Sequence, residues 1–513
     1  MRNSSLAGSC AVILPLLSRR SVADKGDANC REQVLGLYNM IIRDSEQSSY
    51  VRIARVRIRA DYFFRWDRPE AAYANESYSN LFKHTSYGIF LNGHNAEIID
   101  NDLYTSASGI YLGGHGTSLE NANEAVVMRN RISYGSDCYQ VDSSSHVIFE
   151  QNSCTGNSLF SHGNAMGATY GGPASSFIFF AGNRIQFVFG MDQEEMTLDG
   201  GGHTVYNGPV AVSAGGLNLT MPRDPEFDKW CPNTISKWCP KLPCKCVTVN
   251  TNHTGSAVYI IGGTGQGQMR TVADGGDWLN RTWVLERPFG GVGGGVALDE
   301  TSFVTFNARR ERNIYRDNLF LDGGAMQLWG LMWHSIVASN RAVRAGGFIV
   351  TDYFEYSSDY FIETHHNHVE QVPYYGSPGI NINGKYNASA DFTGPLVAAS
   401  VWRGNHIDNG AWGIDGAVSD LLIEGNTMTN CEHGVQVDVN CRPWHRCNQT
   451  HRIALRSNSG LKTDDITSAV AASISSCFNQ TYQNSPAVHR PLQTSALQLL
   501  DGCAAVHQAP EPV

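Results

Sequence analysis

The sequence predicts an all-β fold: a right-handed parallel β-helix, a solenoid of short strands, with an inserted antiparallel β lobe. Three observations lead to this prediction. A short apolar run followed by Asn recurs along the 513-residue chain, an apolar run led by Gly follows many of these Asn residues, and the repeat stops between Asp199 and Asn318. The composition agrees, because 52 Gly and only 17% charged residues favour turns and short strands over long, salt-bridged helices.

The recurring Asn residues mark the successive coils. The closest spacings are 22 residues, from Asn130 to Asn152, and 21 residues, from Asn405 to Asn426, and they fit one coil with minimal loops. Asn tolerates the left-handed backbone of a sharp turn, and its amide can bond the same group one coil away, so we expect both properties at each position. The complete series is Asn101, Asn130, Asn152, Asn183, Asn318, Asn340, Asn367, Asn405, Asn426 and Asn458.

Gly-led apolar runs such as 109–112, 324–328, 347–350 and 434–437 follow many of these turns. Strand, Asn turn and Gly-led strand together resemble the pectate-lyase-like superfamily of right-handed β-helices over about residues 85 to 460. The resemblance implies the fold and leaves the activity open, because lyases, hydrolases, epimerases and non-catalytic tailspikes share this scaffold.

The sequence divides into six expected segments. Arg2, the apolar stretch 6–17 and Ser21-Val22-Ala23 are typical of a secretory leader, although Arg19 and Arg20 lie between the apolar core and the cleavage site. Strand-like runs at 257–261, 269–273 and 282–285, separated by Gly-rich turns, predict the antiparallel lobe. The segments are a candidate leader (1–30), an N-terminal cap or first coil (31–84), coils (85–200), the lobe with a Cys-containing loop (201–312), further coils (313–460) and a C-terminal cap or tail (461–513).

Composition and cysteine use favour a secreted, extracellular protein. Thirteen cysteines are many for a reducing compartment, and eight Asn-x-Ser/Thr sequons fit the same location. The spacing of Cys231, Cys239, Cys244 and Cys246 matches no usual zinc pattern, so we expect disulfides there and no metal site. A net charge of -10 argues against a nucleic-acid partner. No apolar run approaches the roughly 20 residues of an integral membrane span.

The densest acidic cluster is the first candidate catalytic site. Asp192, Glu194 and Asp199 follow the apolar run 187–189 directly. In an extended strand at least two carboxylates of this cluster share a face, which raises the pKa of one of them and suits the acid and base of glycoside hydrolysis. The alternative is a solvated turn that leads into the lobe.

A second candidate site lies between residues 136 and 167. Asp137-Cys138, Cys154 and His162-Gly163 resemble the Asp-Asp-Cys, Cys and His-Gly motifs of polygalacturonase-type glycoside hydrolases, although Ser136 stands where that family has its proton-donating aspartate. The resemblance implies catalytic roles for Asp137 and His162 and a disulfide between Cys138 and Cys154. The alternative explanation is coil geometry that the two folds share.

Aromatic and acidic residues downstream predict the saccharide-binding groove. Exposed rings offer flat apolar platforms to sugar faces, while neighbouring carboxylates hold hydroxyl groups. The expected substrate-binding residues are Trp329, Trp333, Tyr353, Tyr356, Asp352 and Glu355.

These features lead to one functional hypothesis and two alternatives. We expect a secreted protein that binds a polysaccharide along the β-helix and hydrolyses it without a cofactor. A polysaccharide lyase, often calcium-dependent, is the second possibility, but no Asp-rich calcium motif stands out. The third is a non-catalytic surface or adhesive protein whose groove only binds glycan. An enzyme must bring its carboxylates into a groove, whereas an adhesin can leave them scattered on turns.

Overall fold

The fold was analysed in a computed structural model of the full chain. Within the residues that it describes, the protein is all-β and contains no helix. The described residues are 42–43, 49–59, 88–91, 93–105, 108–113, 124–135, 137–141, 144–157, 164–165, 175–188, 194–199, 206–212, 216–220, 254, 257–262, 264–265, 268–273, 282–289, 298–299, 301–307, 311–329, 332–351, 359–371, 379–384, 397–410, 412–416, 418–431, 435–438, 451–460 and 474–477.

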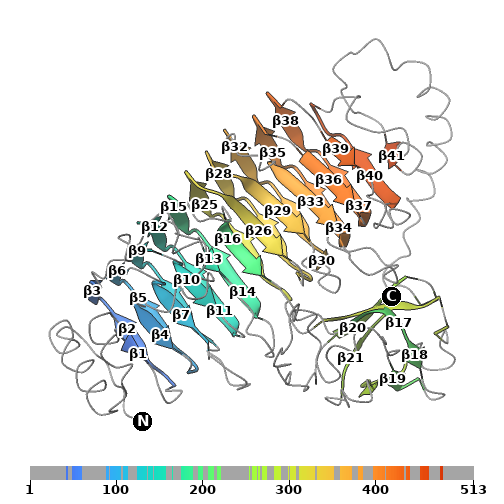
Figure 1. The fold of residues 1–513 in the computed structure, drawn as a ribbon, viewed down its shortest axis with the longest axis horizontal. Coiled ribbons are helices and arrows are strands. Elements are labelled where there is room, and N and C mark those ends of the chain that lie inside the picture. Colours follow the sequence, from blue (N-terminus) through green and yellow to red (C-terminus); the bar gives the residue numbers. More distant parts are fainter. Residues whose placement is uncertain are drawn as a thin grey trace, which may run out of the picture. The chain divides into compact units, whose positions relative to one another are not determined.

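The chain divides into two compact units. The first comprises Met1–Thr169, Ala174–Leu198 and Ile314–Met326, and the second comprises Tyr170–Pro173, Asp199–Asn313 and Gln327–Val513. Each unit contains parallel sheets that the chain visits in turn, so that successive strands belong to different sheets (Figure 1). This arrangement of many parallel strands is compatible with the β-helix that the repeat predicts.

The first unit contains parts of three parallel sheets. Its first sheet contains β1 (Ile42–Arg43), β4 (Ile89–Leu91), β7 (Ile110–Leu112), β10 (Tyr139–Val141), β13 (Asn164–Ala165) and β16 (Glu194–Asp199). Its second sheet contains β2 (Arg52–Ala54), β5 (Glu97–Ile99), β8 (Val126–Met128), β11 (Ser145–Glu150), β14 (Ser176–Ala181) and β24 (Ile314–Arg316). Its third sheet contains β3 (Arg57–Arg59), β6 (Asp102–Tyr104), β9 (Arg131–Tyr134), β12 (Ser153–Gly156), β15 (Arg184–Gln186) and β25 (Leu319–Leu321).

The second unit repeats the pattern. Its first sheet contains β29 (Gly347–Thr351), β33 (Ile380–Gly384), β36 (Trp412–Gly416) and β39 (Val435–Asp438). Its second sheet contains β27 (Ile336–Ala338), β31 (Glu363–His365), β34 (Val397–Arg403), β37 (Val418–Glu424), β40 (His451–Arg456) and β41 (Ile474–Cys477), and β30 (Asp359–Tyr360) pairs with β34. Its third sheet contains β28 (Arg341–Val343), β32 (His368–Glu370), β35 (His406–Asp408) and β38 (Thr427–Thr429).

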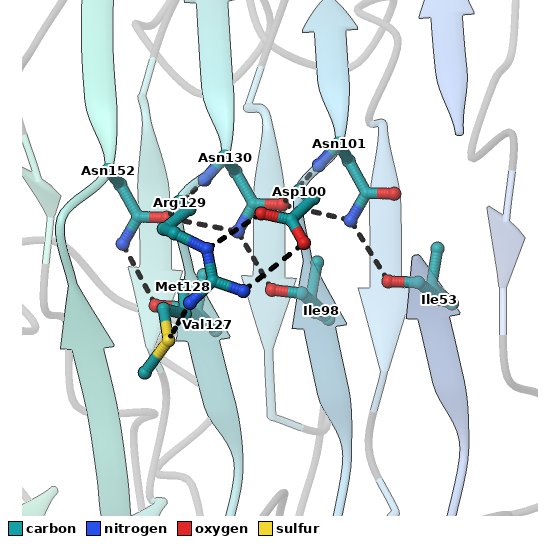
Figure 2. A network of polar contacts seen from close by, with 9 residues as sticks. All are labelled: Ile53, Ile98, Asp100, Asn101, Val127, Met128, Arg129, Asn130 and Asn152. Carbon is teal, nitrogen blue, oxygen red and sulfur yellow. Dashed lines mark hydrogen bonds and ion pairs between the residues drawn. The ribbon is translucent and has the colours of Figure 1, made fainter. Parts of the chain in front are cut away.

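The predicted Asn residues form buried amide ladders between the second and third sheets of each unit. Asn130 Oδ1 accepts hydrogen bonds from the backbone N and the Nδ2 of Asn101, at 3.0 and 2.9 Å. Asn130 Nδ2 also donates to the carbonyl oxygen of Ile98 at 2.8 Å, and Figure 2 shows the same contacts repeated on neighbouring turns. The ladder joins Asn101, Asn130, Asn152, Asn183 and Asn318 in the first unit and Asn340, Asn367, Asn405, Asn426 and Asn458 in the second.

From the sequence we expected the left-handed backbone at the Asn itself. In the structure it occurs at the residue before the Asn. Asp100 has a φ of 58° and Arg129 a φ of 52°, and both are exposed. The Asn must direct its amide inward to reach the neighbouring turns, and the preceding residue reverses the chain where its side chain meets solvent. The other residues before a ladder Asn are Gln151, Gly182, Asp317, Ser339, His366, Gly404, Gly425 and Ser457, and Arg55 takes the same position before Val56, whose backbone N donates to Asn101 Oδ1.

The core follows the alternation of the short strands. In β5 the side chain of Ile98 is fully buried, and its neighbours Glu97 and Ile99 are half-buried on the opposite face. The disulfide between Cys138 and Cys154 lies in this core: both residues are fully buried, and their Cα atoms are 5.8 Å apart. The structure therefore confirms the disulfide that the polygalacturonase resemblance implied.

The inserted lobe is antiparallel, as the sequence predicts. One sheet orders β17 (Tyr206–Pro209), β23 (Phe303–Asn307), β20 (Ala257–Gly262) and β21 (Met269–Thr271). The other orders β18 (Ala211–Val212), β19 (Asn218–Thr220) and β22 (Thr282–Val284). They enclose their own core of Leu219, Val258, Ile260, Val272, Trp283, Leu285, Phe289 and Val304.

Candidate functional site

Most of the residues that the sequence analysis selected cannot be placed as side chains. Asp192, His162, Asp352, Tyr353, Glu355 and Tyr356 lie outside the described residues. Glu194 and Asp199 begin and end β16, and Trp329 ends β26 (Ala325–Trp329); for these three the structure describes the strand alone. Their roles therefore stay predictions.

Asp137 and Trp333 are the selected residues whose side chains are described. Asp137 is half-buried beside the Cys138–Cys154 disulfide, and its Oδ2 accepts a hydrogen bond from Ser108 Oγ at 3.0 Å. Trp333 is completely buried and packs edge-on against Tyr360 and Tyr259, at centroid distances of 5.8 and 4.8 Å. A buried ring cannot serve as a platform for a sugar face, so we assign Trp333 to the core.

The best-defined cluster of chemically active side chains lies on the third sheet of the second unit. In β32 and β35 the central residues Val369 and Ile407 are buried, and the flanking residues are half-buried on the outward face. The register places His368 beside His406 and Glu370 beside Asp408. Two imidazoles and two carboxylates therefore occupy neighbouring strands on one face of the sheet.

Glu370 is held from two sides. Arg341 of β28 donates from Nε to Glu370 Oε1 at 2.7 Å, and His368 Nδ1 lies 3.4 Å from the same oxygen. The His368 ring meets the His406 ring edge-on, with centroids 4.5 Å apart. These contacts orient the His368 imidazole between a carboxylate and a second imidazole.

Asp408 is held by the next turn of the chain. Its Oδ1 accepts hydrogen bonds from Thr429 Oγ1 at 2.9 Å and from Asn430 Nδ2 at 2.8 Å. Thr429 Oγ1 also lies 3.3 Å from His406 Nε2, so the hydroxyl connects the second imidazole to the second carboxylate. We call His368, Glu370, His406 and Asp408, with these partners, the His–carboxylate cluster.

The electrostatics of the cluster keep its acids ionised. The hydrogen bond from Arg341 lowers the pKa of Glu370, and the positive charge at His368 acts in the same direction. The hydrogen bonds from Asn430 and Thr429 lower the pKa of Asp408. Burial lowers the pKa of His368, and the charges of His406 and Arg341 reinforce this against the opposing effect of Glu370 and Asp408. Near neutral pH the cluster therefore holds two carboxylates and a neutral His368.

Comparison with known proteins assigns the chain to no family. No protein-family model and no curated protein matches the chain. In the described part of the chain, no group of three or more His, Cys, Asp or Glu side chains is placed to hold a metal ion. The described residues also form no helix long and apolar enough to cross a membrane.

The sequence analysis missed the His–carboxylate cluster, although the ladder contained the signal. Asn367 is followed by His368-Val369-Glu370, and Asn405 by His406-Ile407-Asp408. Both segments read Asn, His, apolar residue, acid. Because the ladder aligns Asn367 with Asn405, identical offsets from the two Asn residues must meet on adjacent strands. Aligning the turns on their Asn residues would have revealed the paired imidazoles and carboxylates.

Proposed function

We propose that this chain is a right-handed parallel β-helix and acts as a secreted glycoside hydrolase on a polysaccharide bound along its sheets. Support for the fold comes from parallel sheets that the chain visits in turn and from the amide ladders at equivalent turns. Support for the chemistry comes from the His–carboxylate cluster. Its side chains lie half-buried on the outward face of the sheet, where they can meet an extended polymer, and its groups can accept and donate the protons that hydrolysis requires.

The pairing of Glu370 with Asp408 carries the proposal. Hydrolysis of a glycosidic bond uses two carboxyl groups, or a carboxylate and another proton donor, on either side of the bond. Glu370 and Asp408 are paired on neighbouring strands, which lie about 4.8 Å apart, so both acids can face the same part of a bound polymer. The pKa values of both acids are lowered, and the pKa of His368 lies below its ordinary 6.5. At mildly acidic pH both acids are therefore still ionised, and the proton for the leaving oxygen would come from the imidazolium form of His368. One carboxylate would stabilise the developing positive charge on the sugar, and the other would accept the proton that the attacking water loses.

A non-catalytic glycan-binding protein is the second candidate, and one observation favours it. Glu370 and Asp408 already accept hydrogen bonds from Arg341, Thr429 and Asn430. Ion pairs of the same kind occur elsewhere on the sheets, as between Arg403 and Glu424 at 3.2 Å. In this alternative the cluster orders the sheet face and offers hydrogen bonds to sugar hydroxyls, and it transfers no protons.

A polysaccharide panel separates the candidates. The purified protein is incubated with neutral and uronic-acid polymers, and reducing ends are followed separately from the absorbance of unsaturated products. For a substrate that releases reducing ends, Glu370→Gln and Asp408→Asn should each lower the rate about a hundredfold or more, because each removes an ionisable group.

Glu424→Gln is the matched control, since it neutralises a paired carboxylate on another sheet of the same unit. If Glu370→Gln and Asp408→Asn release reducing ends at the same rate as the control, the His–carboxylate cluster is not catalytic. Binding without release of reducing ends would establish the non-catalytic candidate, and unsaturated products would establish a lyase.

A further inference from the structure

The third sheet of the first unit presents an outward face rich in arginine. Its inward residues Ile58, Leu103, Ile132, Cys154 and Ile185 are buried at 3% exposure or less. On the last strand of this sheet in the unit, β25, the outward residues are apolar, Leu319 and Leu321. On the other five strands they are Arg57 and Arg59 of β3, Asp102 and Tyr104 of β6, Arg131 and Ser133 of β9, Ser153 and Thr155 of β12, and Arg184 and Gln186 of β15. We call these residues the arginine face.

The charge of the arginine face opposes that of the whole chain. Among its described residues four are arginines, and Asp102 is the single carboxylate. The chain as a whole has a net charge of -10. Asp102 is shared by Arg57 and Arg131, at 3.5 and 3.2 Å, so one negative charge faces two guanidinium groups. Arg184 binds only a neutral amide in the contacts resolved for it, with its Nη2 2.8 Å from Gln186 Oε1.

The spacing of these arginines suits a linear polymer. The register aligns Arg57, Asp102, Arg131, Ser153 and Arg184 in one row across the sheet. Arginine therefore stands on every second strand, at intervals of about 10 Å, because neighbouring strands are about 4.8 Å apart. The strand spacing is close to the length of one pyranose residue, so this interval matches a polysaccharide with one acidic group in each disaccharide.

The side chains between the arginines favour a sugar polymer over other polyanions. Ser133, Ser153 and Thr155 offer hydroxyl groups that can bond sugar hydroxyls. Tyr104 is the aromatic ring of the face, and the Arg59 guanidinium already lies 5.6 Å from its centroid. Single-stranded nucleic acids require a series of rings on which successive bases stack, and a membrane surface requires apolar side chains that insert. The outward residues of β3, β6, β9, β12 and β15 supply neither, and the two outward leucines of the sheet, Leu319 and Leu321, are confined to β25 and half-buried.

We propose that the arginine face binds an anionic polysaccharide, with Arg57, Arg131 and Arg184 pairing with acidic groups on successive disaccharides. The inference deepens the proposed function, on which it rests for the sugar nature of the ligand, by naming the charge of the polymer. It assigns binding to the first unit, independently of the His–carboxylate cluster in the second.

The test measures binding of the full-length protein to carboxymethyl cellulose and to hydroxyethyl cellulose, which differ in charge. We expect tighter binding to the anionic polymer, and an affinity that falls as salt is raised. The variant Arg57→Gln/Arg131→Gln/Arg184→Gln should lose affinity about tenfold or more, because three charge pairs disappear. These side chains are exposed, so the thermal unfolding midpoint should stay near that of the parent.

The matched control is Arg52→Gln/Arg316→Gln/Arg403→Gln, which removes the same charge from exposed arginines on other sheets. Equal loss in both variants, or equal affinity for both polymers, would overturn the inference. Tighter binding to single-stranded DNA or to anionic vesicles than to carboxymethyl cellulose would also overturn it.

If the anionic polymer binds but no polysaccharide is cleaved, the hydrolase proposal fails and the arginine face stands. If a neutral polymer is cleaved and the two polymers bind with equal affinity, the hydrolase proposal stands and the arginine-face proposal fails.

Discussion

Asn152 Oδ1 accepts two hydrogen bonds from Asn130, one from its backbone N at 2.9 Å and one from its Nδ2 at 3.0 Å. Asn130 is 1% exposed, so these groups have no access to water as an alternative partner. Asn130→Leu would leave buried backbone and amide groups of two neighbouring turns unsatisfied. We expect the free energy of unfolding to fall by about 1 to 3 kcal/mol in denaturant titrations. Arg131→Leu, one residue away, is the control and should change stability by less than about 0.5 kcal/mol, because its ion pair with Asp102 is exposed.

The buried Cys138–Cys154 disulfide should stabilise the first unit. It closes a loop with a sequence separation of 16 residues. A cross-link over such a loop restricts the unfolded chain and raises the free energy of unfolding by roughly 3 kcal/mol. Cys138→Ser/Cys154→Ser should lower the unfolding midpoint by an amount that a reductant reproduces in the parent. The reductant should not lower the unfolding midpoint of the double variant further through this site. Non-reducing peptide maps that show both thiols unmodified would contradict the pairing.

If the His–carboxylate cluster hydrolyses a glycan, its pH profile follows from the shifted pKa values. The base form of Asp408 or Glu370 appears as pH rises through a pKa below the ordinary value of about 4. The acid form of His368 disappears as pH rises through a pKa below the ordinary 6.5. The rate should therefore form a bell with its maximum on the acidic side of pH 6.5. His368→Asn should remove the alkaline limb, whereas a rate that is flat from pH 4 to 8 would exclude this proton donor.

The lobe meets the parallel sheets of the second unit through a contact between a tyrosine and a histidine. Tyr259 of β20 lies with its hydroxyl 2.5 Å from His334 Nε2, and the His334 ring stacks on Phe361 at 4.6 Å. Burial lowers the pKa of His334, and Arg312 adds to this effect. Burial and the charge of Glu311 raise the pKa of Tyr259, with Arg312 opposing them, so the tyrosine remains a neutral donor.

Because the folded-state pKa of His334 is below the unfolded value, its contribution to stability is complete above about pH 6.5 and is lost as pH falls toward the folded-state pKa. Tyr259→Phe should cost about 1 kcal/mol at pH 8, by loss of one hydrogen bond. The cost should change as the pH is lowered, because the imidazolium is a poor acceptor for the hydroxyl. A cost that stays constant from pH 8 to 5 would show that this contact does not sense protonation.

The ladder positions could be predicted from the sequence because a buried amide has few ways to satisfy its hydrogen bonds. An Asn that recurs after apolar runs must find a similar partner on the next turn, and the structure confirms this from Asn101 to Asn318 and from Asn340 to Asn458. The left-handed conformation was assigned to the wrong residue. The residue before each Asn varies from Asp100 to Gly425, and such variety carries no sequence signal for backbone geometry.

The candidate site was harder to predict because proximity across strands depends on register. Charges that are dense along the chain, as at Asp192 and Glu194, are visible in the sequence directly. The clustered residues Glu370 and Asp408 are 38 positions apart, and only the alignment of Asn367 with Asn405 brings them together. Trp333 was selected for its neighbours in sequence, whereas its environment is set by Tyr259 from the inserted lobe.

Each ladder Asn offers the same acceptor to the turn before it and the same donors to the turn after it. Asn405 is bonded to Asn426, 21 residues further on, and Asn426 is bonded in the same way to Asn458. A chain without residues 406–426 would therefore present Asn458 to Asn405 with the geometry that Asn426 now provides. Single turns are interchangeable parts in this architecture, and gain or loss of one complete turn by recombination can change the length of the molecule without disturbing the junctions on either side.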